Sequence, residues 1–92
     1  MKFAWDSAKA TSNLAKHKID FREATTVFGD PFARIDEDAK HSFGEERSEI
    51  IGFSNRFRLL VVTFTERQGG IRIITARRAT NEERNIYENS AF

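Results

Sequence analysis

Arginine is the residue type that offers chemistry in the second half of this chain. Positions 53–80 hold six arginines and one acid, whereas positions 20–49 hold nine acids and four bases. Guanidinium groups stay charged at physiological pH and bind phosphate through paired hydrogen bonds. The basic segment therefore predicts either an anionic ligand, such as an RNA backbone, or salt bridges to acids such as Glu45, Glu46 and Glu49. The residue types alone leave both interpretations open.

A β-hairpin is the element expected to carry most of these arginines. Residues 59–65 and 71–75 are apolar and β-branched, and a polar stretch that ends in two glycines separates them. Because side chains alternate along a strand, we expect Arg72 and Arg78 on one face of the sheet and Arg77 on the other. Burying an unpaired guanidinium is costly, so Arg72 should face a groove or a partner.

Proton transfer needs a titratable side chain within reach, and the sequence offers few. His41 and Glu45 lie in a polar stretch, residues 37–46, that we expect to be a mobile loop. Tyr87 lies in the last expected helix. The predicted catalytic residues are Arg72, Arg77, Arg78, Tyr87, His41 and Glu45. The predicted RNA-binding residues are Arg67, as a substrate clamp, with Arg58 and Arg56.

Several other classes of site are not expected. The chain has no cysteine, which excludes a disulfide framework and a thiolate metal site. His17 and His41 lack a second ligand at helical spacing, so we predict no metal and no cofactor. His17 is interpreted as a cation at the C-terminal end of a helix. No stretch approaches the roughly 20 apolar residues of a membrane span, which predicts a soluble, cytoplasmic protein.

The elements that must position these residues fit one domain, residues 1–92. Asp6, Asp20 and Thr80 are expected to cap helices. The expected order is β-α-α-β-β-β-β-α, an α+β fold with a small antiparallel sheet, helices packed on one face and the other face partly open. The strands are expected at 3–5, 32–36, 47–53, 59–65 and 71–75, and the helices at 7–18, 21–28 and 81–89.

The order and spacing of seven segments resemble the BrnT family of type II toxins along essentially the whole chain. The segments are FAWD (3–6), NLAKH (13–17), DFREA (20–24), VFGDP (27–31), GEER (44–47), LVVTFTER (60–67) and RIITARRAT (72–80). The chain departs from the family pattern at Lys18, where glycine is usual, and at Ala4, where glutamate is frequent. Both departures lie outside the arginine-rich half.

The resemblance implies a fold similar to that of the RelE ribonucleases and a cognate BrnA-like antitoxin with a ribbon-helix-helix part. It implies a heterotetramer with that antitoxin, which would repress its own operon. Operator DNA would be contacted only through the antitoxin. The free toxin would cleave RNA and inhibit translation.

Two functional hypotheses follow. In the first, the chain is a metal-independent endoribonuclease in which the ribose 2′-OH attacks the adjacent phosphate and arginines stabilise the phosphorane. In the second, it is a non-catalytic module that binds RNA or the antitoxin and acts in operon autoregulation. A copy that retains only antitoxin binding is a third possibility. Cleavage of naked RNA in the presence of a chelator separates the first hypothesis from the other two.

Overall fold

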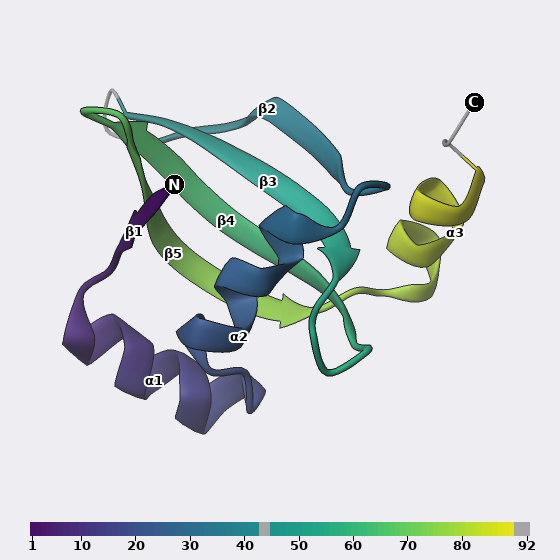
Figure 1. Ribbon diagram of the computed structural model, residues 1–92, viewed down its shortest axis with the longest axis horizontal. Coiled ribbons are helices and arrows are strands. Elements are labelled where there is room, and N and C mark those ends of the chain that lie inside the picture. The colour runs from purple at the N-terminus through teal and green to yellow at the C-terminus, as the bar shows by residue number, and fades with distance from the viewer. Residues whose placement is uncertain (43–44, 90–92) are drawn as a thin grey trace.

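The computed structural model confirms the predicted order of the elements (Figure 1). It describes residues 1–42 and 45–89, and for residues 38–42 and 45 the backbone alone. The elements are β1 (Lys2–Ala4), α1 (Ser7–His17), α2 (Phe21–Thr26), the 3₁₀ turn η1 (Val27–Gly29), β2 (Arg34–Ser42), β3 (Glu45–Phe53), β4 (Leu59–Arg67), β5 (Gly70–Arg78) and α3 (Asn81–Asn89).

The strands form one five-stranded sheet in the order β1-β5-β4-β3-β2. The pairs from β2 to β5 are antiparallel, but β1 pairs with β5 in parallel, with Phe3 opposite Ile71. The sheet is therefore mixed, and the prediction of a purely antiparallel sheet was wrong at this edge. Consecutive strands pair locally, whereas β1 joins the last strand of the chain, a pairing that side-chain alternation does not reveal.

The prediction of a loop at residues 37–46 was also wrong. Strands β2 and β3 continue through most of it as a long hairpin, in which Lys40 pairs with Arg47 and His41 with Glu46. Charged residues are depleted in strands, so this stretch looks like a loop in the sequence. Cross-strand hydrogen bonds nevertheless hold the backbone, because the ladder does not depend on apolar side chains.

Helix ends follow the expected caps. The Asp6 carboxylate accepts a hydrogen bond of 3.0 Å from the backbone N–H of Lys9, and Asp20 accepts one of 2.8 Å from that of Arg22. Lys18 ends α1 in the left-handed conformation with φ 62°, a position that favours glycine. The side chains of these caps thus satisfy backbone donors that a helix leaves unpaired.

The core lies between α2 and one face of the sheet. Figure 1 shows α2 in front of the strands, α1 beside β5 at the edge of the sheet, and α3 apart at the far end. Phe21, Ala24 and Val27 are buried against side chains from β3, β4 and β5. The sheet residues of this cluster are Ile50, Leu60, Val62, Phe64, Ile73 and Ala76. The prediction that helices pack on one face is confirmed for α2, whereas α3 contacts β3 at the end of the sheet.

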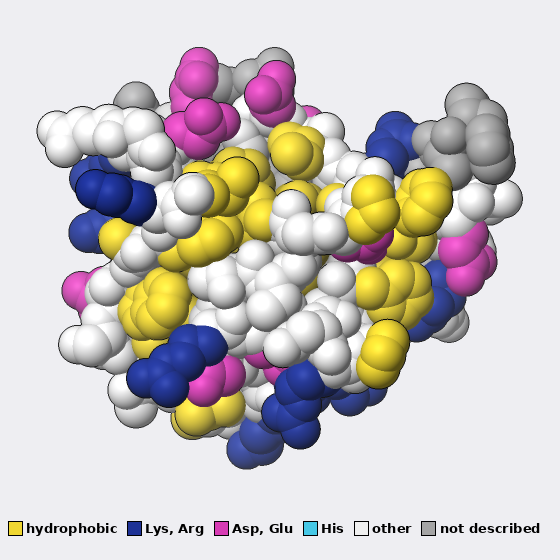
Figure 2. Space-filling model, viewed as in Figure 1, with side chains coloured by type: hydrophobic (Ala, Val, Ile, Leu, Met, Phe, Trp, Pro, Cys, Tyr) yellow, Lys and Arg dark blue, Asp and Glu magenta, His cyan; other side chains and the backbone are white. Residues whose placement is uncertain are grey.

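The surface on the helix side carries two groups of exposed hydrophobic side chains. Figure 2 shows one group in the upper left part of this face and another on the side where α3 lies, with basic side chains along the lower border. Phe32, Ile35 and Ile86 are among the exposed large hydrophobic residues.

Candidate functional site

A β-bulge in β5 decides which arginines share a face. Thr63 of β4 pairs with Thr75 and Phe64 pairs with Ile73, so Ile74 is an extra residue without a partner on β4. An extra residue reverses the alternation of side chains beyond it. Arg72 lies opposite Thr65, and Arg77 lies opposite Val61. Arg72 and Arg77 therefore share one face of the sheet.

The predicted pairing of Arg72 with Arg78 on one face was wrong. Arg78 lies opposite Leu60, which belongs to the core cluster, so Arg78 belongs to the face that α2 covers. It lies at the end of that face and its side chain is exposed. The expectation that Arg77 and Arg78 lie on opposite faces holds, since the bulge precedes both residues.

The face that points away from α2 is called here the open face. By register it comprises Arg47, Glu49, Thr63, Thr65, Arg67, Arg72, Thr75 and Arg77, and also the apolar residues Ile51, Phe53, Leu59 and Val61. Thr63 and Thr65 are buried, whereas Arg72 is half-buried and Thr75 is exposed. The part of this face around Thr63 and Thr65 carries hydroxyls and guanidinium groups beside the Glu49 carboxylate. Hydroxyls and guanidinium groups are suited to binding an anion.

Two arginines flank Thr65 on this face. Ser48 pairs with Phe64, and one further step along both strands brings Arg47 opposite Thr65, which pairs with Arg72 on its other side. The Arg47 Nε and the Thr65 Oγ1 are both buried without a hydrogen-bond partner among the described residues. Buried polar groups are normally paired, so this row of three side chains has unused hydrogen-bonding capacity.

Arg67 and Arg72 meet in a hollow at the β1 end of the sheet. The hollow has a volume of about 400 Å³ and is also lined by Lys2 and Ala4. By the register of β1 and β5, Lys2 and Ala4 lie on the same side of the sheet as Arg72. The structure thus brings together one predicted catalytic arginine and the predicted clamp.

Arg77 is held in an ion pair with Glu83 of α3. Two hydrogen bonds of 2.8 Å join the guanidinium to the carboxylate. The hydrogen bond from Arg77 is the main reason that the pKa of Glu83 falls to about 2, and the same carboxylate raises the pKa of Arg77. Glu83 also accepts a hydrogen bond of 2.8 Å from the Thr80 N–H, the predicted capping box. Arg77 therefore ties the end of β5 to α3.

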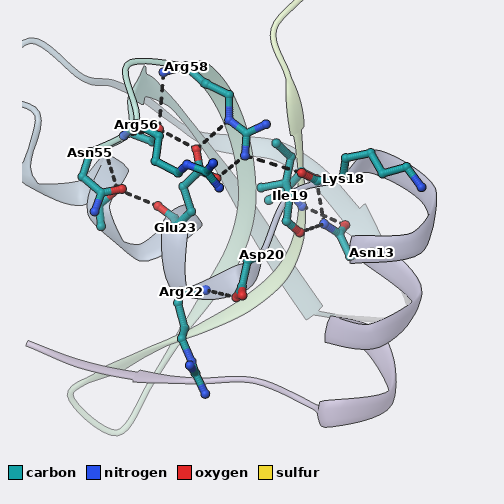
Figure 3. Close-up of polar contacts among 12 residues, drawn as sticks. Asn13, Lys18, Ile19, Asp20, Arg22, Glu23, Asn55, Arg56 and Arg58 are labelled. Carbon is teal, nitrogen blue, oxygen red and sulfur yellow. Dashed lines mark hydrogen bonds and ion pairs between the residues drawn. The ribbon is translucent and has the colours of Figure 1, made fainter.

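Arg58 is likewise engaged inside the chain (Figure 3). Its guanidinium donates to both carboxylate oxygens of the buried Glu23, one of them from Nε at 2.9 Å, and Glu23 also accepts a 2.6 Å hydrogen bond from Ser54. The hydrogen bond from Arg58 is the leading cause that lowers the pKa of Glu23. Arg56 lies beside this cluster, exposed, and lowers the same pKa through its charge.

These two ion pairs bear on the salt-bridge interpretation of the sequence. Arg58 and Arg77 do pair with acids, but the partners are Glu23 and Glu83 rather than the expected Glu46 or Glu49. The charge of Glu49 does contribute to the raised pKa of Arg77. Internal ion pairs therefore engage Arg58 and Arg77 among these arginines.

Tyr87 lies away from the Arg47–Thr65–Arg72 row. Its hydroxyl donates a 2.6 Å hydrogen bond to Asp30, and its ring packs edge-on against Phe53. Burial and the neighbouring Asp30 carboxylate raise the pKa of Tyr87 to about 12. His41 and Glu45 lie in β2 and β3, but their side chains fall outside the described residues.

A basic pocket beside α1 was missed by the sequence analysis. Its lining includes Lys9, Lys16 and His17 of α1 together with Arg47 of β3. The prediction that His17 ends a helix is confirmed, and its side chain also lines this pocket. Lys9 and Lys16 are seven positions apart and hence on one helix face, which was the available signal. Nothing in the sequence indicates that this face meets Arg47.

Comparison with known proteins decides the family. The model of the family described as "Ribonuclease toxin, BrnT, of type II toxin-antitoxin system" matches residues 5–83. The chain belongs to the BrnT family. The crystal structure of the Brucella abortus ribonuclease toxin BrnT is similar to it, with a TM-score of 0.66 and 25% sequence identity over 88% of this chain and 99% of that one. The fold is thus BrnT-like, and the RelE-like description holds only approximately.

No curated protein sequence matches this chain. Among its described residues, no helix is long and apolar enough to cross a membrane. Within the same part of the chain, no group of three or more His, Cys, Asp or Glu residues is placed to hold a metal ion.

Proposed function

We propose that this chain is the toxin of a type II toxin–antitoxin system and that it inhibits translation by cleaving RNA on the open face. The observation that carries the proposal is the row Arg47–Thr65–Arg72. Neither arginine of this row makes an ion pair with a described residue, and the Arg47 Nε and the Thr65 Oγ1 are buried without a hydrogen-bond partner among those residues. Membership of a family of ribonuclease toxins supports the choice of RNA as the anion.

The proposed reaction is an intramolecular transesterification. The ribose 2′-oxygen forms a bond to the adjacent phosphorus, the bond from phosphorus to the 5′-oxygen breaks, and the proton of the 2′-OH is balanced by protonation of the 5′-oxygen. The products are a 2′,3′-cyclic phosphate and a 5′-OH end. The phosphorane carries extra negative charge, which guanidinium groups already in place stabilise without reorganisation. The step needs no metal ion.

Residue roles follow from the positions described above. Arg72 and Arg47 would stabilise the phosphorane, and Arg67 would clamp the neighbouring backbone from the hollow that it shares with Arg72. His41 and Glu45 are the proposed proton-transfer groups, as in the sequence analysis. Tyr87 is a poorer candidate because a pKa of about 12 and a hydrogen bond to Asp30 keep its hydroxyl protonated and engaged.

Membership of the BrnT family supports an antitoxin as the protein partner. A BrnA-like ribbon-helix-helix antitoxin would neutralise the chain in a heterotetramer, and operator DNA would be bound by the antitoxin. We further propose a cytoplasmic location, where both RNA and the antitoxin are available.

The test is cleavage of naked RNA by the purified chain in the presence of EDTA. We expect products with 2′,3′-cyclic phosphate ends, and we expect Arg72→Gln to lower the rate by about 100-fold, as for the loss of one electrostatic stabiliser. Arg22→Gln is a matched control, because Arg22 is exposed on α2 and points away from the Glu23–Arg58 cluster (Figure 3). RNA binding without products would instead support a non-catalytic module. Equal cleavage by Arg72→Gln and the wild type would refute the proposed site.

A further inference from the structure

The basic pocket beside α1 is continuous with the open face through Arg47. It has a volume of about 320 Å³ and lies where α1 meets the edge of β5. Four of its lining residues come from one side of α1, namely Lys9, Ser12, Lys16 and His17, and Arg47 and Thr75 come from the sheet. Arg47 belongs both to this pocket and to the row that contains Arg72.

Asn13 fixes α1 in this position. Its side-chain amide donates hydrogen bonds to the carbonyl oxygens of Ala76 at 2.9 Å and Ile19 at 3.1 Å, and its Oδ1 accepts one of 3.1 Å from the Ala76 N–H. Asn13 is buried and forms these bonds along the edge of β5 beyond the end of β1. The pocket is therefore held by a rigid joint between helix and sheet.

The bulge at Ile74 adds to the pocket. It places Thr75 on the open face with an exposed side chain, and both Ile74 and Thr75 line the pocket. Bulges frequently redirect a side chain next to a functional site. Here the redirected group is a hydroxyl, which can donate a hydrogen bond to an anion.

The charge of the lining is one-sided. Lys9, Lys16 and Arg47 carry positive charge, His17 adds an imidazole, and no carboxylate is among those lining residues whose side chains the structure describes. The Arg47 Nε is buried without a partner among the described residues, although buried donors are normally satisfied. A ligand with several acceptor oxygens would pair this donor and neutralise the cations. Most of the polar lining groups can donate hydrogen bonds, which suits a tetrahedral phosphate.

We propose that this pocket binds a backbone phosphate of single-stranded RNA next to the phosphate at Arg72. The inference rests on the proposed function, because it assigns a second subsite to the same substrate. Lys9 and Lys16 supply charge, Ser12 and Thr75 supply hydroxyl donors, and Arg47 links the two subsites. The RNA path then runs from the Arg67–Arg72 hollow across Thr65 to α1.

The experiment measures binding and does not require cleavage. A fluorescent 2′-O-methyl oligoribonucleotide, which lacks the attacking hydroxyl, is titrated with the whole chain by anisotropy at several salt concentrations. Each phosphate contact with a single strand contributes about 0.7 to the slope of log K against log salt. We expect Lys9→Gln and Lys16→Gln each to reduce the slope by about 0.7 and to weaken binding about fivefold at 0.1 M salt. Both lysines are exposed, so the variants should fold.

Arg22→Gln is again the control and should keep the wild-type slope. Slopes for Lys9→Gln and Lys16→Gln that match this control would overturn the inference. If those slopes stay unchanged while Arg72→Gln abolishes cleavage, the proposed function stands and the pocket assignment fails. If the slopes fall but no RNA is cleaved, the pocket assignment stands without the ribonuclease. Weaker antitoxin binding with unchanged RNA slopes would assign the pocket to the antitoxin and overturn the RNA subsite.

Discussion

The ion pair between Arg77 and Glu83 predicts a stability that depends on pH. The change to make is Glu83→Gln, because glutamine keeps the capping hydrogen bond to Thr80 and removes the charge. The pKa of Glu83 falls from an ordinary 4.5 to about 2. This difference corresponds to about 3 kcal/mol. The Glu83 and Arg77 side chains are 20% and 36% exposed, so solvent screening reduces the expected loss to about 1–2 kcal/mol at pH 7.

The direction of this pH dependence follows from the linkage between protonation and folding. A carboxyl group whose folded pKa is depressed stabilises the folded state above its unfolded pKa and loses that contribution as pH falls through its folded pKa. The contribution of Glu83 should therefore be complete above about pH 5 and should decline between 4.5 and about 2. The free-energy difference between wild type and Glu83→Gln should shrink by more than half between pH 7 and pH 3.

Urea denaturation followed by circular dichroism at both pH values is the assay. A double-mutant cycle with Arg77→Gln isolates the coupling between the two side chains. If Glu83→Gln lowers the free energy of unfolding by the same amount at pH 3 and pH 7, the argument is refuted, because such a loss would have to come from packing or capping. The cycle also tests the catalytic prediction for Arg77. If Arg77→Gln abolishes RNA cleavage without loss of stability, its main role is chemical rather than structural.

Two further predictions concern other contacts. Asn13→Ala should lower the free energy of unfolding by about 2–3 kcal/mol, because three buried hydrogen bonds of 2.9–3.1 Å are lost, and a urea titration would check this. An unchanged midpoint would show that the joint between α1 and β5 does not depend on Asn13. Tyr87→Phe should cost about 1 kcal/mol at pH 7. The wild type should also lose stability between about pH 10 and 12, because the unfolded tyrosine ionises first; a variant with the same alkaline loss would contradict the assigned pKa.

The order of elements could be predicted from the sequence because its signals are local. Asp6, Asp20 and Thr80 cap helices as expected, and α3 begins at the predicted residue and extends to Asn89, the last described residue. The strand at residues 37–42 could not be predicted, because its charged side chains give no apolar alternation. The parallel pairing of β1 with β5 joins distant parts of the chain and leaves no local trace.

The candidate site was predicted only in part for the same reason. Arg67 and Arg72 do share a hollow, as their proposed roles require. Arg58 and Arg77 were chosen for their charge, but pairing with Glu23 and Glu83 depends on tertiary contacts that the sequence does not display. Arg47 was overlooked because its neighbours in space, Thr65 and the α1 lysines, are far away in the chain.

The bulge residue Ile74, which has no partner on β4, determines which face of the sheet the side chains of β5 occupy. A substitution on either side of Ile74 changes one side chain only. Deletion of Ile74 would restore strict alternation, so that every side chain in one half of β5 would point to the opposite face. With the second half held by Asn13, residues 70–73 would turn over, bringing Arg72 toward the core and Ile73 to the open face. The fold should therefore tolerate substitutions in β5 far more readily than insertions or deletions.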